Sequence, residues 1–312
     1  MVYNVFDMSQ APPVSKPVLW SALLIQQSLG ALTFPIAKYG LSFIDPFVFA
    51  FYRFSFSAVV LLTIVRLQRH RQPIEKRDFI KILGLGVLII PFNQTAYLVG
   101  QQLTAASHGA LLFATVPLWL FVTALIHLKE RFVLRRGIGV VLGIIGVLLI
   151  ITGGAIEISR TYLWGDLIIL EAVLAWVYYT IMGKPLVIKY GAFRVTAYSL
   201  SFGSALYFPF GFYRAWIFDY SAVPPAAWLT VLYAALGVSV AAYVLWYWLL
   251  KHLETTRLAV FNNIQPVIAS VVAMIFLGEP LGISLVMGGT IVLAGVIITE
   301  ISGKRKILKK NS

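Results

Sequence analysis

The sequence predicts an all-α integral membrane protein, with ten transmembrane helices arranged as two inverted five-helix repeats. Three observations predict this fold: an apolar composition, ten long apolar runs, and a repeat that relates the two halves of the chain. Hydrophobic residues make up 60% of the chain and charged residues 12%, and the mean hydropathy is +0.87. Soluble globular domains contain about 45–50% apolar and about 25% charged residues, so this composition indicates a membrane protein.

Each apolar run has roughly the length of about 20 residues that a helix needs to cross the hydrocarbon core of a bilayer. Only helices and closed barrels satisfy their backbone hydrogen bonds in lipid, and the runs lack the alternation of barrel strands. We therefore expect helices at residues 18–38, 45–65, 79–99, 106–126, 134–152, 162–182, 194–214, 226–249, 256–277 and 281–300.

The repeat runs without a gap through both halves of the chain. Five residues recur 149 positions later: Pro117, Leu128, Glu130, Gly139 and Gly146 return as Pro266, Leu277, Glu279, Gly288 and Gly295. The basic residues around them do not recur, because Lys129, Arg131, Arg135 and Arg136 become Gly278, Pro280, Ser284 and Leu285. This loss of positive charge indicates that the two copies face opposite sides of the membrane.

An odd number of helices in each half makes the repeat inverted. Trp20 starts the first half from the inside, and Trp164, 144 positions later, starts the second half from the outside. Inverted repeats are typical of secondary transporters, in which the two halves exchange conformations around a central site. The predicted division is a cytoplasmic segment at 1–17, a first repeat at 18–153, a second repeat at 162–301 and a basic cytoplasmic tail at 302–312.

The distribution of basic residues predicts the orientation. If the N-terminus is cytoplasmic, nearly all Lys and Arg residues fall on inside segments, and only Lys38, Arg160 and Arg214 fall outside. The positive-inside rule then places both termini in the cytoplasm. The net charge of +13 needs no nucleic acid to explain it, since the chain offers no contiguous soluble basic face. The expected partners are the lipid bilayer and a small-molecule substrate.

Short motifs occur in the same order in both halves. The first half has Gly30 with Pro35 and Lys38, then Tyr52-Arg53-Phe54, Thr115-Val116-Pro117, Lys129-Glu130-Arg131 and the glycines 139, 143 and 146. The second half has Leu174-Ala175-Trp176, Tyr243-Val244-Leu245-Trp246, Gln265-Pro266 and Leu277-Gly278-Glu279-Pro280-Leu281. Together these motifs resemble the drug/metabolite transporter superfamily, in its EamA-like branch. One departure is Leu29, where the family usually has Trp.

The resemblance implies a carrier of small metabolites, often an exporter of amino acids or related compounds. Its third, fourth, eighth and ninth helices, with parts of the first and sixth, would line a central cavity. Its fifth and tenth helices would pack away from the cavity, and the spacing of Gly139 and Gly143 suits close helix packing or a dimer contact. The resemblance is also consistent with a multi-pass protein of the bacterial inner membrane, as a monomer or homodimer, without a cofactor.

The polar residues at membrane depth are the candidates for the substrate cavity. Glu171 falls near the middle of the sixth span, where a carboxylate costs about 2.5–3.5 kcal/mol and usually faces a cavity or relays protons. A neutral, hydrogen-bonded structural role is the alternative. Gln27, 144 positions earlier, is its counterpart in the first helix.

Further candidates lie beside prolines that interrupt two spans. Asn93, Gln94 and Tyr97 follow Pro91 in the third span, and Asn262 and Asn263 precede Pro266 in the ninth. A proline can free a backbone carbonyl to face a cavity, so these amides are candidate substrate ligands, with interhelical hydrogen bonding as the alternative.

Aromatic and titratable residues complete the candidate cavity. Trp176 and Tyr243 lie deep enough to form a stacking wall, although aromatic side chains near helix ends often act as interface anchors. His108 lies toward the outer end of the fourth span, where it is either solvated or a second group for proton coupling beside Glu171.

Five residues are expected to have structural or gating roles: Arg53, Pro117, Glu130, Pro266 and Glu279. Arg53 lies inside the second span, and its long side chain can reach toward a helix end. Glu130 and Glu279 lie just past their helices, where each can cap or pin a loop.

These features favour a secondary-active transporter that works by alternating access around a cavity at the bilayer midplane. No Walker A loop is present, so ATP does not drive it directly. The four scattered histidines and the absence of cysteine disfavour an enzyme or a metal site. The main alternative is a flippase for a lipid or a lipid-linked headgroup, followed by a carrier of sugars or nucleotide sugars.

Overall fold

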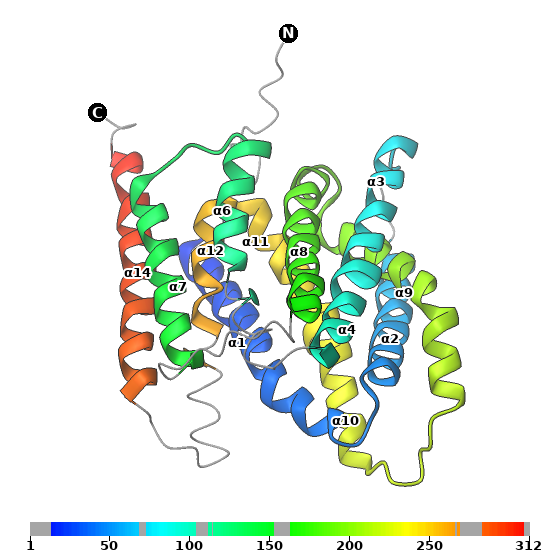
Figure 1. Ribbon diagram of the computed structural model, residues 1–312. Coiled ribbons are helices and arrows are strands. Elements are labelled where there is room, and N and C mark those ends of the chain that lie inside the picture. Colours follow the sequence, from blue (N-terminus) through cyan, green and yellow to red (C-terminus); the bar gives the residue numbers. More distant parts are fainter. Residues whose placement is uncertain are drawn as a thin grey trace.

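A computed structural model of the chain describes residues 14–68, 73–103, 112–113, 115–152, 163–265, 267–268 and 283–308. These residues form helices joined by turns and loops, and none of them is in a strand (Figure 1). The elements are α1 (Lys16–Leu41), α2 (Pro46–Leu67), α3 (Lys76–Val87), η2 (Leu88–Thr95), α4 (Ala96–Leu103), α6 (Val116–His127), α7 (Leu134–Thr152), α8 (Leu163–Tyr190), α9 (Ala192–Trp216), α10 (Pro225–Tyr233), η4 (Ala234–Ala242), α11 (Tyr243–His252), α12 (Thr255–Phe261) and α14 (Ile283–Leu308).

The predicted all-α class is confirmed, and within the described ranges four helical stretches are long and apolar enough to cross a membrane. They are Pro46–Leu67, Lys76–Gly100, Leu163–Tyr190 and Pro225–His252. They coincide with the second, third, sixth and eighth predicted spans. Helices also lie on the other predicted runs, while the count of ten spans and their inverted arrangement stay predictions.

Proline and aspartate residues mark where several of these helices begin. The Asp45 carboxylate accepts hydrogen bonds from the Phe47 and Val48 amides, at 3.0 and 3.2 Å, and Pro46 is the first residue of α2. Pro117 stands in the first turn of α6, where its missing N–H costs no hydrogen bond. A second Asp45 oxygen lies 2.7 Å from Arg214 of α9, which fixes the start of α2 against its neighbour.

Two π-helical segments, η2 and η4, widen the third and eighth spans at corresponding places. The sequence predicts an interruption at Pro91, and the structure has a π-helical stretch there from which the chain continues into α4. A proline removes one backbone hydrogen bond, and a wider turn accommodates the gap. The η4 segment contains Gly237 and no proline. Such widened turns occur frequently at functional sites.

Glycines allow α7 and α14 to pack closely. A β-carbon built on Gly139 would lie 2.7 Å from the Gly295 carbonyl oxygen, and one built on Gly295 would lie 2.8 Å from the Gly139 carbonyl oxygen. The Gly146 position meets the Gly288 carbonyl oxygen in the same way, at 2.5 Å. The start of α7 therefore faces the end of α14, so the two helices run antiparallel.

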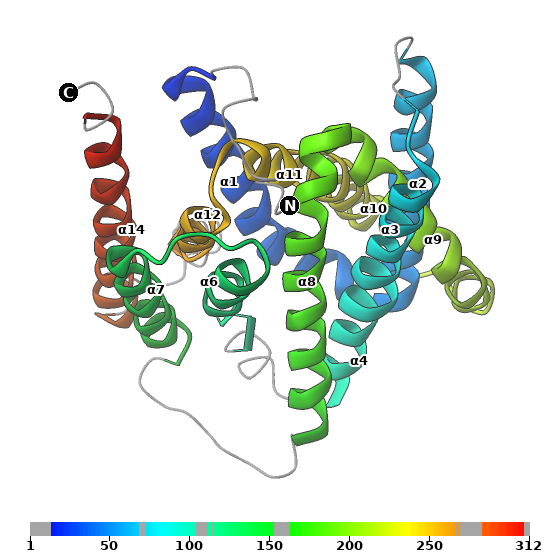
Figure 2. The same ribbon diagram turned by 90° about the horizontal axis from the view of Figure 1, so that it is seen from above.

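The helices are ordered across the molecule from one edge to the other. Both views place α7 and α14 side by side at one edge, while α2, α3 and α9 pack together at the opposite edge (Figure 1 and Figure 2). The helices α1, α6, α8, α11 and α12 lie between these edges. The buried polar side chains described below come from this middle region and the elements that border it.

Candidate functional site

Arg53 lies two turns into α2, at the point where η2 and η4 approach that helix. Its Nε donates to the Ser239 hydroxyl of η4 at 2.9 Å, and Nη1 donates to the Gln94 side-chain oxygen of η2 at 3.4 Å. The guanidinium carbon is 4.8 Å from the centroid of the Phe54 ring, and the Tyr243 hydroxyl also interacts with the guanidinium. The side chain of Arg53 therefore joins both π-helical segments.

The hydrogen bonds continue from Gln94 to α8. Gln94 Nε2 donates to Asn93 Oδ1 at 2.5 Å, and Asn93 Nδ2 donates to the Ala172 carbonyl oxygen at 2.7 Å. Asn93 is almost completely buried. We call Arg53, Asn93, Gln94 and Ser239 the polar belt; with the Ala172 carbonyl it connects α2, η2, η4 and α8.

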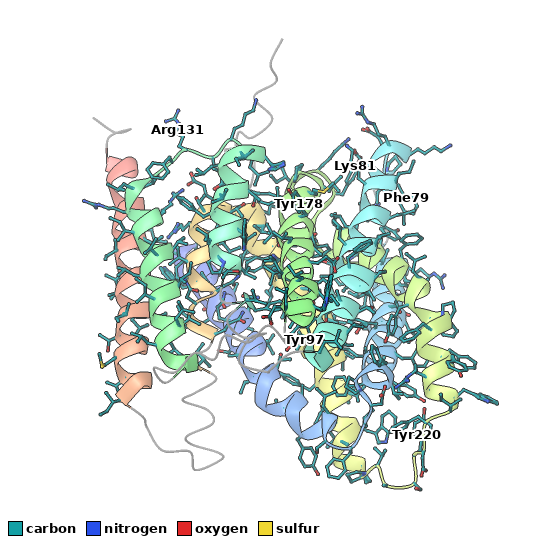
Figure 3. All side chains as sticks on the ribbon, in the orientation of Figure 1. Phe79, Lys81, Tyr97, Arg131, Tyr178 and Tyr220 are labelled. Carbon is teal, nitrogen blue, oxygen red and sulfur yellow. The ribbon has the colours of Figure 1, made fainter. Side chains whose placement is uncertain are left out.

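Glu171 precedes Ala172 on α8 and is partly buried. Its carboxylate makes no hydrogen bond or ion pair with any residue in the described part of the chain. Tyr97, on α4, packs its ring edge-on against Phe113 at a centroid distance of 5.1 Å. Figure 3 places Tyr97 between the end of the molecule that carries Lys81 and the end that carries Tyr220.

The two residues predicted to form an aromatic wall, Trp176 of α8 and Tyr243 of α11, lie side by side. The ring centroids of Trp176 and Tyr243 are 5.5 Å apart, and Trp176 also stacks on Tyr179 at 5.7 Å. Trp246 and Tyr247 are fully buried and bond to Thr180 and to the Tyr179 carbonyl. Trp176 and Tyr243 thus border the polar belt, whereas Tyr179, Trp246 and Tyr247 belong to the hydrophobic core.

Gln27 and Asn262 form a second polar contact, between α1 and the end of α12. Gln27 Nε2 donates to Asn262 Oδ1 at 3.3 Å, and the Asn263 side chain packs against Gly143 of α7. Gln26 Oε1, Gln27 Oε1 and Asn263 Nδ2 are buried and have no hydrogen-bond partner among the described residues. Buried polar atoms without partners cost free energy, so a polar ligand or water would stabilise this contact. No hydrogen bond joins Gln27 to Glu171.

A third polar group lies at the end of α8 and centres on Glu130. Lys184 is almost completely buried, and its Nζ lies 2.9 Å from Glu130 Oε1, 3.0 Å from Thr255 Oγ1 and 3.1 Å from the Leu253 carbonyl oxygen. The Glu130 oxygens also accept from the amides of Thr255 and Thr256, at 2.7 and 2.9 Å. These two amides open α12, so Glu130 satisfies the start of a helix that has no side-chain cap of its own.

The charge state of Glu130 follows from these contacts. Burial alone would raise the pKa of Glu130, but Lys184 and the two backbone amides outweigh burial and hold this pKa at about 2. Arg136 extends the group, since it donates to the Thr256 hydroxyl at 2.7 Å and forms an ion pair with Glu254. We call Glu130, Lys184, Arg136 and Glu254 the charged latch.

Ser239 and Lys184 were not among the predicted site residues. A serine in an apolar helix carries little signal, because it can bond to its own backbone. Lys184 lies beyond the predicted end of the sixth span at residue 182, but α8 continues to Tyr190 and carries Lys184 inward. His108, Pro266 and Glu279 fall outside the described residues, and their roles stay predictions.

Among the described residues, no group of three or more His, Cys, Asp or Glu side chains is arranged to hold a metal ion. The chemistry of the belt is hydrogen bonding from amides, a hydroxyl and a guanidinium. Such a set can bind and orient a small polar molecule.

The chain is similar to transporters along most of its length. The profile of the EamA-like transporter family matches residues 20–152 and again residues 163–301. The uncharacterized transporter YyaM of Bacillus subtilis is 28% identical over 284 residues, which cover 90% of this chain and 92% of that protein. An uncharacterized transporter of Archaeoglobus fulgidus is 27% identical over 282 residues, which cover 89% of this chain and 95% of that protein.

A solved crystal structure shares the fold. It has a TM-score of 0.75 over 90% of this chain and 98% of that chain, at 17% sequence identity. The family profile covers well over half of the sequence, so this multi-pass membrane protein belongs to the EamA-like transporter family, of the drug/metabolite transporter type.

Proposed function

We propose that this transporter is a secondary-active carrier that exports a small polar metabolite, an amino acid or a related compound, by alternating access around the polar belt. The observation that carries the proposal is the belt itself. It brings a guanidinium, two amides and a hydroxyl from α2, η2 and η4 together at membrane depth, beside the carbonyl of Ala172. Polar groups at this depth are costly and mark substrate pathways.

The glycine contacts support an inverted repeat. Gly288 and Gly295 are the repeat partners of Gly139 and Gly146, each 149 positions later. Gly139 meets Gly295, and Gly146 meets Gly288, so each copy contacts the other reciprocally. Reciprocal contacts are expected at a two-fold axis, and the antiparallel packing of α7 and α14 suits an axis in the membrane plane.

The positions of charged residues support a cytoplasmic face at one end of the bundle. Lys81 and Arg131 lie at one end, whereas Tyr220 lies at the other (Figure 3). The charged latch belongs to the end with Arg131, since Glu130 is its neighbour in sequence. We assign the latch to a cytoplasmic gate that holds the start of α12 against α8 and must open when the site faces the cytoplasm.

Glu171 supports a substrate with a basic group, or coupling to protons. It is a partly buried carboxylate next to the residue where the belt ends, and no described residue neutralises it. Trp176 and Tyr243 add flat apolar surfaces that would contact the body of a metabolite.

The test is transport by the purified protein in liposomes. Vesicles preloaded with unlabelled metabolites are diluted into the labelled compound, and counterflow is measured for a panel of amino acids, sugars and nucleotide sugars. We expect counterflow of an amino acid or a close relative, and its loss in Asn93→Leu. Thr290→Val, on the exposed side of α14, is the matched control and should keep the wild-type rate.

Other outcomes would redirect the proposal. Movement of fluorescent lipid between leaflets, without counterflow of any soluble compound, would indicate a flippase. Counterflow that survives Asn93→Leu unchanged would remove the belt from the transport path.

A further inference from the structure

Arg53 differs from three other buried or partly buried cations in the described part of the chain, each of which pairs with a carboxylate. Lys184 pairs with Glu130, Arg136 with Glu254, and Arg214 with Asp45. Arg53 has Ser239, Gln94 and Tyr243 as its polar partners, and all three are neutral. No described carboxylate lies within ion-pair distance of its guanidinium.

A guanidinium stays charged in a protein, so Arg53 cannot lose its charge to suit this environment. Charges inside a bundle are normally paired, because an unpaired charge away from water costs free energy. Glu171 does not supply the missing charge, since no ion pair joins it to Arg53. Among the described residues, therefore, no side chain supplies a counter-charge to Arg53.

The described partners of Arg53 leave N–H donors of the guanidinium available to an anion. Nε donates to Ser239 and Nη1 to Gln94, and the Tyr243 hydroxyl is the third described partner of the guanidinium. A guanidinium has five N–H donors in a planar fork that matches a carboxylate. The side chain is also partly exposed, although it lies among the elements that carry the polar belt.

The contacts argue against a side chain that reaches toward the membrane surface. Two of the three polar partners of Arg53, Gln94 and Ser239, come from the π-helical segments η2 and η4, which lie within the third and eighth spans. These contacts hold the guanidinium at belt depth, beside Tyr243 and within reach of the wall that Trp176 completes. The expected structural role of Arg53 leaves its charge unexplained.

We propose that Arg53 binds an anionic group of the transported substrate, a carboxylate, and so makes the carrier selective for carboxylate-bearing metabolites. This inference rests on the proposed function and names the substrate chemistry of the same site. Gln94 of η2 and Ser239 of η4, one from each half of the chain, orient the guanidinium that would hold the carboxylate.

The test uses matched pairs of small probes that differ in charge but little in shape: acetate and acetamide, succinate and succinamide, benzoate and benzamide. The purified full-length protein is heated with each probe, since a ligand that binds the folded state raises the apparent midpoint of unfolding. We expect at least one acid to stabilise the wild type at a concentration about tenfold or more below its amide. That factor corresponds to about 1.4 kcal/mol of binding free energy.

Three variants test whether Arg53 is the source of the preference for acids over amides. Arg53→Gln should abolish the difference between acid and amide, and Arg53→Lys should keep a weaker preference, because it retains the charge without the fork. Arg66→Gln removes an exposed arginine from the last turn of the same helix and should keep the wild-type preference. If Arg53→Gln does not fold, the comparison of acids with amides on the wild type and on Arg53→Lys still tests the proposal.

The proposal is overturned if every acid and its amide act alike on the wild type, including the case in which neither stabilises it. It is also overturned if a folded Arg53→Gln keeps the preference for acids. Liposomes that transport amides as fast as acids contradict this inference and leave the carrier function intact. Preferred stabilisation by acids without transport of any solute contradicts the carrier function and leaves the anion site intact.

Discussion

Glu130 and Lys184 form an ion pair at 2.9 Å in which both side chains are almost completely shielded from solvent. The pair joins the loop after α6 to the C-terminal half of α8, and the same Glu130 carboxylate accepts from the first amides of α12. One carboxylate thus ties together segments from both halves of the chain. These contacts explain why the loop after α6 contains a glutamate at position 130.

Removal of Glu130 should destabilise the protein strongly. Glu130→Gln leaves the buried Lys184 ammonium without a counter-charge, which costs about 3–5 kcal/mol of unfolding free energy. Glu75→Gln is the matched control, because the Glu75–Lys189 pair is exposed and worth about 0–1 kcal/mol. Chemical unfolding in detergent measures both, and equal effects of the two substitutions would contradict the role of the latch.

The same pair predicts how stability depends on pH. The pKa of Glu130 is lowered from 4.5 to about 2, so its stabilisation is complete above pH 4.5 and is lost as the pH falls toward 2. The full shift is worth on the order of 3 kcal/mol. The wild type should therefore lose more unfolding free energy across this range than Glu130→Gln. Parallel pH profiles would contradict the assignment.

Glu171→Gln tests proton coupling. If Glu171 carries the coupled proton, the variant should lose accumulation driven by a pH gradient while it keeps counterflow, because a glutamine cannot titrate. The measurement is uptake into liposomes with and without an imposed gradient. Accumulation at the wild-type level would remove Glu171 as the coupling group.

Gly295→Ala tests the close contact between α7 and α14. The added β-carbon would lie 2.8 Å from the Gly139 carbonyl oxygen, and such overpacking typically costs about 1–3 kcal/mol. Gly84→Ala is the control, since its β-carbon meets no atom within 4 Å. The control should be neutral or stabilising by about 0.5–1 kcal/mol, as expected for alanine in a helix. Equal midpoints of thermal unfolding for both variants would contradict the packing argument.

Composition and apolar runs were sufficient to predict the helices, because the need to satisfy backbone hydrogen bonds in lipid leaves few alternatives. The ends of the helices were harder to predict. The sixth span was expected to end at residue 182, yet α8 continues to Tyr190, since Lys184 finds Glu130 and Thr255 and need not reach water. A partner from a distant segment leaves no signal in the local sequence.

The candidate site was predictable only in part. Polarity at membrane depth identified Asn93 and Gln94, and both belong to the belt. Ser239 was missed, because its role depends on Arg53, which lies far away in sequence. Lys129 has a left-handed backbone conformation, with φ of 51°. The one hint of this in the sequence is its repeat partner Gly278, because glycine adopts this conformation without strain.

Alternating access around the belt is the central claim, and a single cysteine tests it most directly. The chain has no cysteine, so Gln94→Cys carries one thiol, at a partly exposed belt position. Its labelling by a membrane-impermeant thiol reagent is measured from each side of oriented vesicles, with Ser221→Cys in the exposed loop before α10 as the one-sided control. We expect Gln94→Cys to react from both sides and Ser221→Cys from one. Reaction of Gln94→Cys from one side only, or from neither, would contradict the account.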